Sequence, residues 1–226
     1  MAKNNIRDFI NRNVERQLIR EFLQHNTKRA GFGGLDIKRT PQGTEVVLHA
    51  ERPGAVIGHR GKIINGLQRR LDDEFNIDNP KLSVEDVNTP ELNAQIMASK
   101  IADFLERGWY YRRAGHSAAM NIMGKGARGV IITLAGKLTG SRHRTQKFIQ
   151  GHIKYCGETA IEHMDRGYAV AVKKLGTIGV TVAIMRPGTK LPHEVTIFSD
   201  ADLAQRAREA EMEATAPVPT TEEAAS

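Results

Sequence analysis

Two glycines separated by two residues, Gly58-His59-Arg60-Gly61, constrain the fold of this chain more than any other feature. They join two helical patterns, a short one opened by Pro53 and a longer one after Gly61 with Ile63, Ile64, Leu67, Leu71 and Phe75 on one face. Glycine suits such a junction because it adopts backbone conformations closed to other residues and lets the main chain approach a ligand closely. The motif therefore predicts a sharp turn between two helices with an accessible backbone.

The same turn carries the chemistry of an anion site. A helix start has unpaired amide groups and a partial positive charge, which together attract phosphate. His59, Arg60 and Lys62 add donors and formal charge, and we expect Val56, Ile57 and Ile64 to line an apolar groove beside the loop. A bare G-x-x-G is more often only a tight turn with exposed basic residues, but these flanks favour phosphate binding.

The hydrophobic pattern predicts an α+β protein built from two units and a tail. The first unit is predicted to have helices over 4–25, 53–58, 62–75 and 90–107 and strands near 34–39, 44–50 and 81–87, with Thr89 capping the last helix. The second is predicted to have helices over 109–123 and 165–175 and strands over 129–134, 146–155 and 178–185. We place the domains at 1–107 and 108–198, followed by a flexible acidic tail over 199–226.

Charge is unevenly distributed along the chain. The whole chain carries +7, but residues 200–226 contain seven acidic and two basic residues. Subtracting this −5 leaves +12 on residues 1–199, a balance typical of proteins that bind polyanions. The single cysteine, Cys156, excludes an internal disulfide, and we expect it to be a small buried residue in a reducing, cytoplasmic setting. No apolar run suggests a membrane span.

Residues 56–64 resemble the KH family, whose G-x-x-G loop clamps nucleotides between two helices. Three further stretches are similar to the ribosomal small-subunit protein three family in its archaeal and eukaryotic form: Tyr111-Arg112-Arg113-Ala114, residues 165–171 and residues 176–182. The resemblance runs from about Ile6 to Val195 and implies a type-II KH domain followed by a second α+β domain.

The resemblance also implies a role. It implies a structural, non-enzymatic protein of translation that binds small-subunit ribosomal RNA in the head of the subunit, near where mRNA enters. The implied partners are that RNA, mRNA and neighbouring head proteins, with no membrane, cofactor or small-molecule substrate. In this family, the residues that match Gly58, His59, Arg60, Gly61 and Lys62 contact RNA.

Two more basic groups are candidates for RNA contact. The first surrounds one predicted helix and comprises Arg107, Arg112, Arg113, His116, Lys125 and Arg128. The resemblance assigns Arg112 and Arg113 to contacts with incoming mRNA and to an opening effect on mRNA duplexes. Bacterial members carry another basic residue where this chain has His116, so the sequence leaves open whether duplex opening is retained. The second group lies in a glycine-containing segment and comprises Lys137, Arg142, Arg144 and Lys147. The alternative for both groups is a solvated surface.

Other chemical signals are weaker. Residues 124–129 fit the dinucleotide string G-x-G-x-x-G, but they are predicted to follow a helix and precede a strand, the reverse of a cofactor site. His152, Cys156 and His163 lack zinc-site spacing. We predict no catalytic or metal-binding residues. A nucleic-acid-cutting enzyme and a free KH-type regulator stay as alternative functions.

Overall fold

The computed structural model describes residues 2–40, 43–75, 79–192 and 194–195, without the side chains of residues 2–5 and 8. The chain divides into two units, residues 1–189 and 190–226, and the fold below is that of the first. The tail predicted over 199–226 and most of the turn predicted at 40–43 lie outside the described residues. Among the helices that are described, none is both long enough and apolar enough to cross a membrane.

The first sheet has three strands in the order β1-β2-β3, formed by Phe32–Thr40, Gly43–Ala50 and Lys81–Asp86. β1 and β2 are antiparallel, whereas β2 and β3 are parallel, because two helices intervene between them. β2 is central and buries Val46, Leu48 and Ala50 on one face, as predicted, but Val47 on its other face is buried as well, so the strand is more buried than its predicted alternation indicates. The predicted strands are therefore confirmed, with small shifts at their ends.

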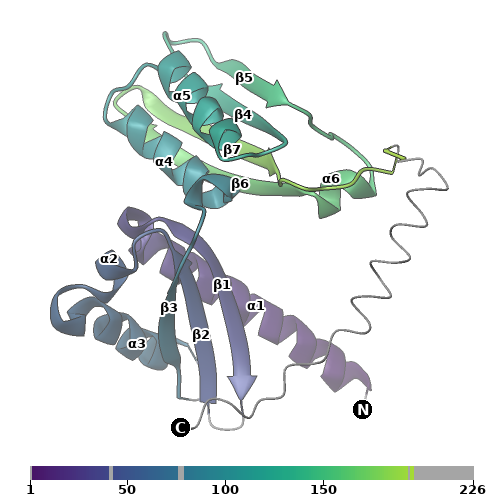
Figure 1. Cartoon of the computed structure of the whole chain (residues 1–226). Helices are drawn as coiled ribbons and strands as arrows, with labels where there is room; N and C mark the ends of the chain where they lie inside the picture. Colours follow the sequence, from purple (N-terminus) through teal and green to yellow (C-terminus); the bar gives the residue numbers. More distant parts are fainter. Residues whose placement is uncertain (1, 41–42, 76–78, 193, 196–226) are drawn as a thin grey trace, which may run out of the picture. The chain divides into compact units, whose positions relative to one another are not determined.

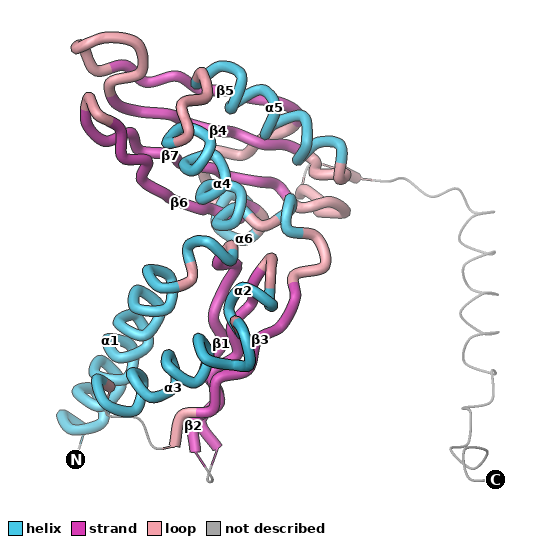
Figure 2. Tube along the Cα trace, turned by 90° about the vertical axis from the view of Figure 1, so that its left-hand side faces the viewer, coloured by secondary structure: helices cyan, strands magenta, loops and turns pink. Residues whose placement is uncertain are grey.

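Helices α1 (Ala2–Asn26) and α3 (Lys62–Glu74) cover one face of this sheet, as Figure 2 shows. Ile19 and Leu23 of α1 and Leu67 and Leu71 of α3 meet the sheet in one apolar core. Earlier in α1, the predicted apolar face stays exposed, and it comprises Ile6, Phe9, Ile10, Val14 and Leu18. Among the side chains of α1 that the structure describes, the buried ones, Ile19 and Leu23, therefore lie in the second half of the helix. The short helix α2 (Pro53–Ile57) precedes α3 and also reaches this core, through Val56.

The second sheet has four antiparallel strands in the order β5-β4-β7-β6. They are Arg144–Gly151, Gly129–Gly136, Gly176–Met185 and Met164–Lys173, in that order across the sheet. Helices α4 (Ala94–Glu106) and α5 (Tyr111–Gly124) pack on one face, as Figure 1 shows, and α6 (Glu158–Glu162) precedes β6. β5 ends at Gly151, before the predicted Tyr155.

Helix α4 contributes its buried face to the core of the second sheet. Ile101, Ala98 and Leu105 join Val180, Val182 and other inward residues of β7 there. The predicted division at residue 107 would instead place this helix in the first domain. The domain division at residue 107 stays a prediction, but this packing favours a boundary before α4.

Asn93 links the two sheets at the start of α4. Its side-chain oxygen accepts hydrogen bonds from the amides of Gln95 and Ile96, so Asn93 is the cap that the sequence analysis assigned to Thr89. Thr89 instead precedes a short 3-10 turn over Pro90–Leu92 and makes no side-chain cap bond.

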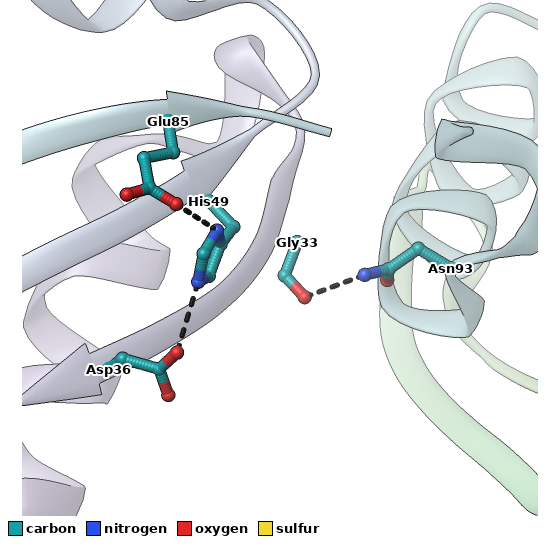
Figure 3. Close-up of polar contacts among 5 residues, drawn as sticks. All are labelled: Gly33, Asp36, His49, Glu85 and Asn93. Carbon is teal, nitrogen blue, oxygen red and sulfur yellow. Dashed lines mark hydrogen bonds and ion pairs between the residues drawn. The ribbon is translucent and has the colours of Figure 1, made fainter. Parts of the chain in front are cut away.

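The Asn93 side-chain amide also donates a hydrogen bond to the Gly33 carbonyl of β1 at 2.8 Å, which joins the two sheets (Figure 3). Nearby, His49 lies between Asp36 and Glu85, tying β2 to both neighbours.

β6 corrects a wrong prediction, since residues 165–175 were expected to be helical. The strand does alternate, but its inward positions are small, with Gly167, Ala169 and Ala171 facing α4. A Cβ on Gly167 would lie 2.2 Å from the Ala94 carbonyl oxygen, so helix and strand touch backbone to backbone. The larger residues of β6 face outward, which hides the usual pattern of apolar inside and polar outside.

Candidate nucleic-acid interface

The G-x-x-G loop follows α2 and leads through a 3-10 turn, His59–Gly61, into α3. Gly58 and Gly61 have φ values of 70° and 71°, and Arg60 between them has φ 53°. This run of left-handed conformations produces the sharp bend that the sequence predicts. A Cβ on Gly58 would lie 2.6 Å from the side chain of Ile63, so the glycine is needed for space as well as for conformation.

Cations and donors surround this bend. The side chains of His59, Arg60 and Lys62 are all exposed. Gly61 stands at the N-cap of α3 and offers no side-chain acceptor, and the first turn of that helix holds no acidic residue. The first amides of α3 therefore face an environment of positive charge, which suits a phosphate group.

The apolar surface beside the loop differs from the prediction. Val56 is only 1% exposed and belongs to the core, so its placement in a groove is wrong. Ile57 and Ile63 are exposed by 41% and 48%, and Ile64 is partly buried. Ile63 was not among the predicted groove residues, although its contact with Gly58 places it directly at the loop.

Helix α5 displays the second basic group on its exposed side. Arg112, Arg113 and His116 are exposed, whereas Tyr111, Ala114 and Gly115 are buried against the sheet. A Cβ on Gly115 would lie 2.5 Å from the Phe148 ring, so this glycine lets α5 approach β5. His116 packs edge-on against the same ring, with centroids 4.9 Å apart.

Aromatic rings hold the two arginines of α5. The Arg113 guanidinium lies 4.8 Å from the centre of the Trp109 ring, which in turn stacks on Phe104 at 4.7 Å. Arg112 lies over the Tyr111 ring and donates from Nε to its hydroxyl at 3.1 Å. This hydrogen bond lowers the pKa of Tyr111 and raises the pKa of Arg112. Each exposed cation is therefore oriented by a fixed neighbour.

The third basic group lies along the β4–β5 hairpin. Arg142, Arg144 and Lys147 are exposed, and Lys137 is partly exposed. The charge of Arg144 also lowers the pKa of Tyr111, the residue to which Arg112 donates its hydrogen bond. The structure thus brings together members of two groups that the sequence analysis treated separately. Lys147 is different, since it faces away from α5 on the other side of the sheet.

The remaining predicted residues occupy the ends of the two helices. Arg107 follows α4 and Lys125 follows α5, and both are exposed. Arg128 is partly buried, and its guanidinium donates to the Thr189 carbonyl, so part of its role is to hold the chain that follows β7.

The weaker chemical signals also have a place in the structure. The string over 124–129 leaves α5 and enters β4, the order predicted for a connector. The expectation that Cys156 is buried is wrong, because it is exposed. Within the described part of the chain, no cluster of three histidine, cysteine or carboxylate side chains could hold a metal.

Comparison with known proteins adds two family matches. Residues 18–92 match a model described as a KH domain, and residues 101–184 match a model described as the ribosomal protein S3 C-terminal domain. These matches confirm the predicted fold class, an N-terminal KH domain followed by a second α+β domain.

Similar curated proteins are each called small ribosomal subunit protein uS3. The relative from Haloquadratum walsbyi is 50% identical over 86% of this chain and 60% of its own length. That from Methanocaldococcus jannaschii is 47% identical over 87% of this chain and 95% of its own length. That from Haloarcula marismortui is 48% identical over 86% of this chain and 64% of its own length. With its KH loop, its second sheet and this degree of identity, the chain belongs to the ribosomal protein S3 family.

Proposed function

We propose that this chain is a structural constituent of the small ribosomal subunit, where it binds ribosomal RNA in the head and helps to form the region where mRNA enters. The observation that carries this proposal is the loop over 58–61, where two glycines in left-handed conformations present His59, Arg60 and Lys62 at the start of α3. The names of the relatives support the assignment to the small subunit.

The two sets of cations have separate tasks in this proposal. The G-x-x-G loop holds the phosphates of ribosomal RNA, and these contacts position the protein without reading sequence. The arginines of α5, oriented by Trp109 and Tyr111, contact mRNA. Arg107, Lys125 and the hairpin residues Lys137, Arg142 and Arg144 extend the basic surface. Neighbouring proteins of the head are further partners.

The family is one of structural, non-enzymatic proteins, so the relatives of this chain do not support the alternative of a nucleic-acid-cutting enzyme. A free KH regulator is the other alternative. Sedimentation separates it from the proposal, because a constituent protein should travel with small subunits in a gradient. Tagged protein found only in ribosome-free fractions would contradict the proposed function.

The loop itself is tested by replacing Gly61. Aspartate and asparagine both tolerate a left-handed conformation, and a Cβ at this position meets no atom closer than 3.6 Å. Gly61→Asp places a carboxylate where a phosphate would bind, and we expect affinity for a small-subunit ribosomal RNA fragment to fall at least tenfold at fixed salt. Gly61→Asn has the same shape without the charge and should lose no more than a few-fold. Equal affinity of the two variants would mean that the loop does not contact the RNA phosphates.

A further inference from the structure

The face of the second sheet opposite α4 and α5 is open in the described residues along most of its length. One row of side chains crosses all four strands on this face, because Lys147 pairs with Thr133, Thr133 with Thr181, and Thr181 with Tyr168. Lys147, Thr181 and Tyr168 are exposed, and Thr133 is partly exposed. The row spans three strand spacings, or about 14 Å. A cation thus stands at one edge of the sheet and an aromatic ring at the other.

Tyr168 is 57% exposed, yet its ring lies across the sheet. A Cβ built on Gly179 of the neighbouring strand would lie 3.6 Å from the Tyr168 hydroxyl oxygen and 3.8 Å from a ring carbon. The ring therefore rests over a position that has no side chain of its own. Val170 and Val172 continue an exposed apolar strip along the same strand. This arrangement offers a flat surface on which a base can stack.

A hollow of about 410 Å³ adjoins the ring on the same face. It is lined by Gly179, over which the ring rests, and by Ala135, Gly136, His143, Arg144, Thr145 and Thr177. The outward positions of the described strands carry two charged residues, Lys147 and Arg166, and both are basic. A face with cations, threonine hydroxyls and no outward carboxylate on its strands is complementary to a polyanion.

We infer that this open sheet face binds a single strand of RNA, with a base stacked on Tyr168 and a phosphate held by Lys147. The inference rests on the proposed function, because it adds a second RNA surface to a protein already proposed to bind RNA through the 58–61 loop. Single-stranded RNA suits the site better than a duplex, since only unpaired bases can be laid against a ring on a sheet. Threonines between the two ends of the row supply hydroxyl groups to the sugar and phosphate.

The test uses the full chain with Gly61→Asp, which removes the loop's contribution, and a fluorescent, short single-stranded oligouridylate. In this background we expect Tyr168→Ala to weaken binding about tenfold, because stacking of one base is lost. The affinity of Tyr168→Phe should stay within about twofold of that of Gly61→Asp alone, since the ring is kept. Lys147→Gln should weaken binding less, about threefold, and lower the salt dependence by about one counterion.

Tyr155→Ala is the matched control, because Tyr155 is an exposed tyrosine outside the four strands, and it should leave binding unchanged. Tyr168→Leu keeps apolar cover over Gly179 without the aromatic face, so it should behave like Tyr168→Ala even if the alanine variant folds poorly. Ultraviolet crosslinking of the oligonucleotide should mark β6 in the wild-type chain and in Gly61→Asp.

Equal affinity of Gly61→Asp with and without Tyr168→Leu, and no crosslink on β6, would overturn the inference. Such a result would leave the proposed function standing if Gly61→Asp alone lowers affinity for the ribosomal RNA fragment. Protein crosslinks to this face in assembled subunits, together with unchanged RNA affinity, would instead assign it to a protein neighbour and overturn the inference in the same way.

Discussion

The two main basic surfaces position their charges by different means. At the 58–61 loop, the backbone decides, because Gly58, Arg60 and Gly61 adopt left-handed conformations that aim the chain and its cations outward. On α5, side-chain packing decides, because Trp109 and Tyr111 hold the arginines beside an ordinary helix. Substitutions in the loop should therefore weaken RNA binding by changing backbone conformation, whereas substitutions on α5 should weaken it by removing side-chain contacts.

The largest effect is expected from Gly58→Val. A β-branched residue disfavours φ 70°, and its Cβ would overlap Ile63, so we expect a loss of roughly 2 kcal/mol in the free energy of unfolding. Affinity for a ribosomal RNA fragment should fall at least tenfold, because the bend can no longer form. Urea denaturation and fluorescence anisotropy measure the two effects.

Gly54→Ala provides the control for this variant. Gly54 lies in α2, close to the same loop, but a Cβ there meets no atom within 4 Å. Alanine should stabilise the helix by about 0.5–1 kcal/mol and leave RNA affinity unchanged. If Gly58→Val behaved like Gly54→Ala, backbone conformation would not be what positions the loop.

A smaller effect is expected on α5 from Arg113→Lys. Lysine keeps the charge but lacks the planar group that lies on Trp109, and an exposed contact of this kind contributes about 0.5–1 kcal/mol. We expect affinity for single-stranded RNA to fall about threefold with no change in fold. Arg20→Lys, at an exposed position of α1, is the control and should have no effect. Equal RNA affinity of the two variants would mean that the contact of Arg113 with Trp109 does not contribute to binding.

The smallest effect concerns the dependence of stability on pH. The hydrogen bond from Arg112 holds the pKa of Tyr111 below its ordinary value of 10.0. A depressed pKa favours the ionised form in the folded state. The wild type should therefore gain stability relative to Tyr111→Phe as the pH rises through the folded pKa, with the gain complete above about pH 10. The gain should disappear when the pH falls below that pKa.

Urea unfolding of both proteins at several pH values between neutrality and about pH 10.5 tests this expectation, since the difference between them cancels other groups. Arg112→Gln in both backgrounds should remove most of the difference, because Arg112 is the largest of the groups that lower the pKa of Tyr111. A difference of unchanged size without Arg112 would mean that another group is the main cause of the lowered pKa of Tyr111.

Much of the fold could be predicted because local patterns and tertiary packing agree. Val46 and Leu48 of β2, and Leu67 and Leu71 of α3, are buried as their spacing requires. The bend at 58–61 was predictable for a similar reason, since its conformation depends on glycines that are visible in the chain. The prediction was wrong at β6, where α4 packs on Gly167 and Ala169, so small residues face inward and large ones outward.

The sequence by itself determined where the loop would bend, that most of the helices and strands would form, and that the body would be basic. Those properties depend on neighbours in the chain, on glycine conformation and on charge. Only the tertiary structure decided that α4 joins the second sheet, that Asn93 caps it while holding Gly33, and that the charges of Arg112 and Arg144 both act on Tyr111. Those properties depend on residues far apart in the chain, whose meeting follows from how the sheets pair and pack.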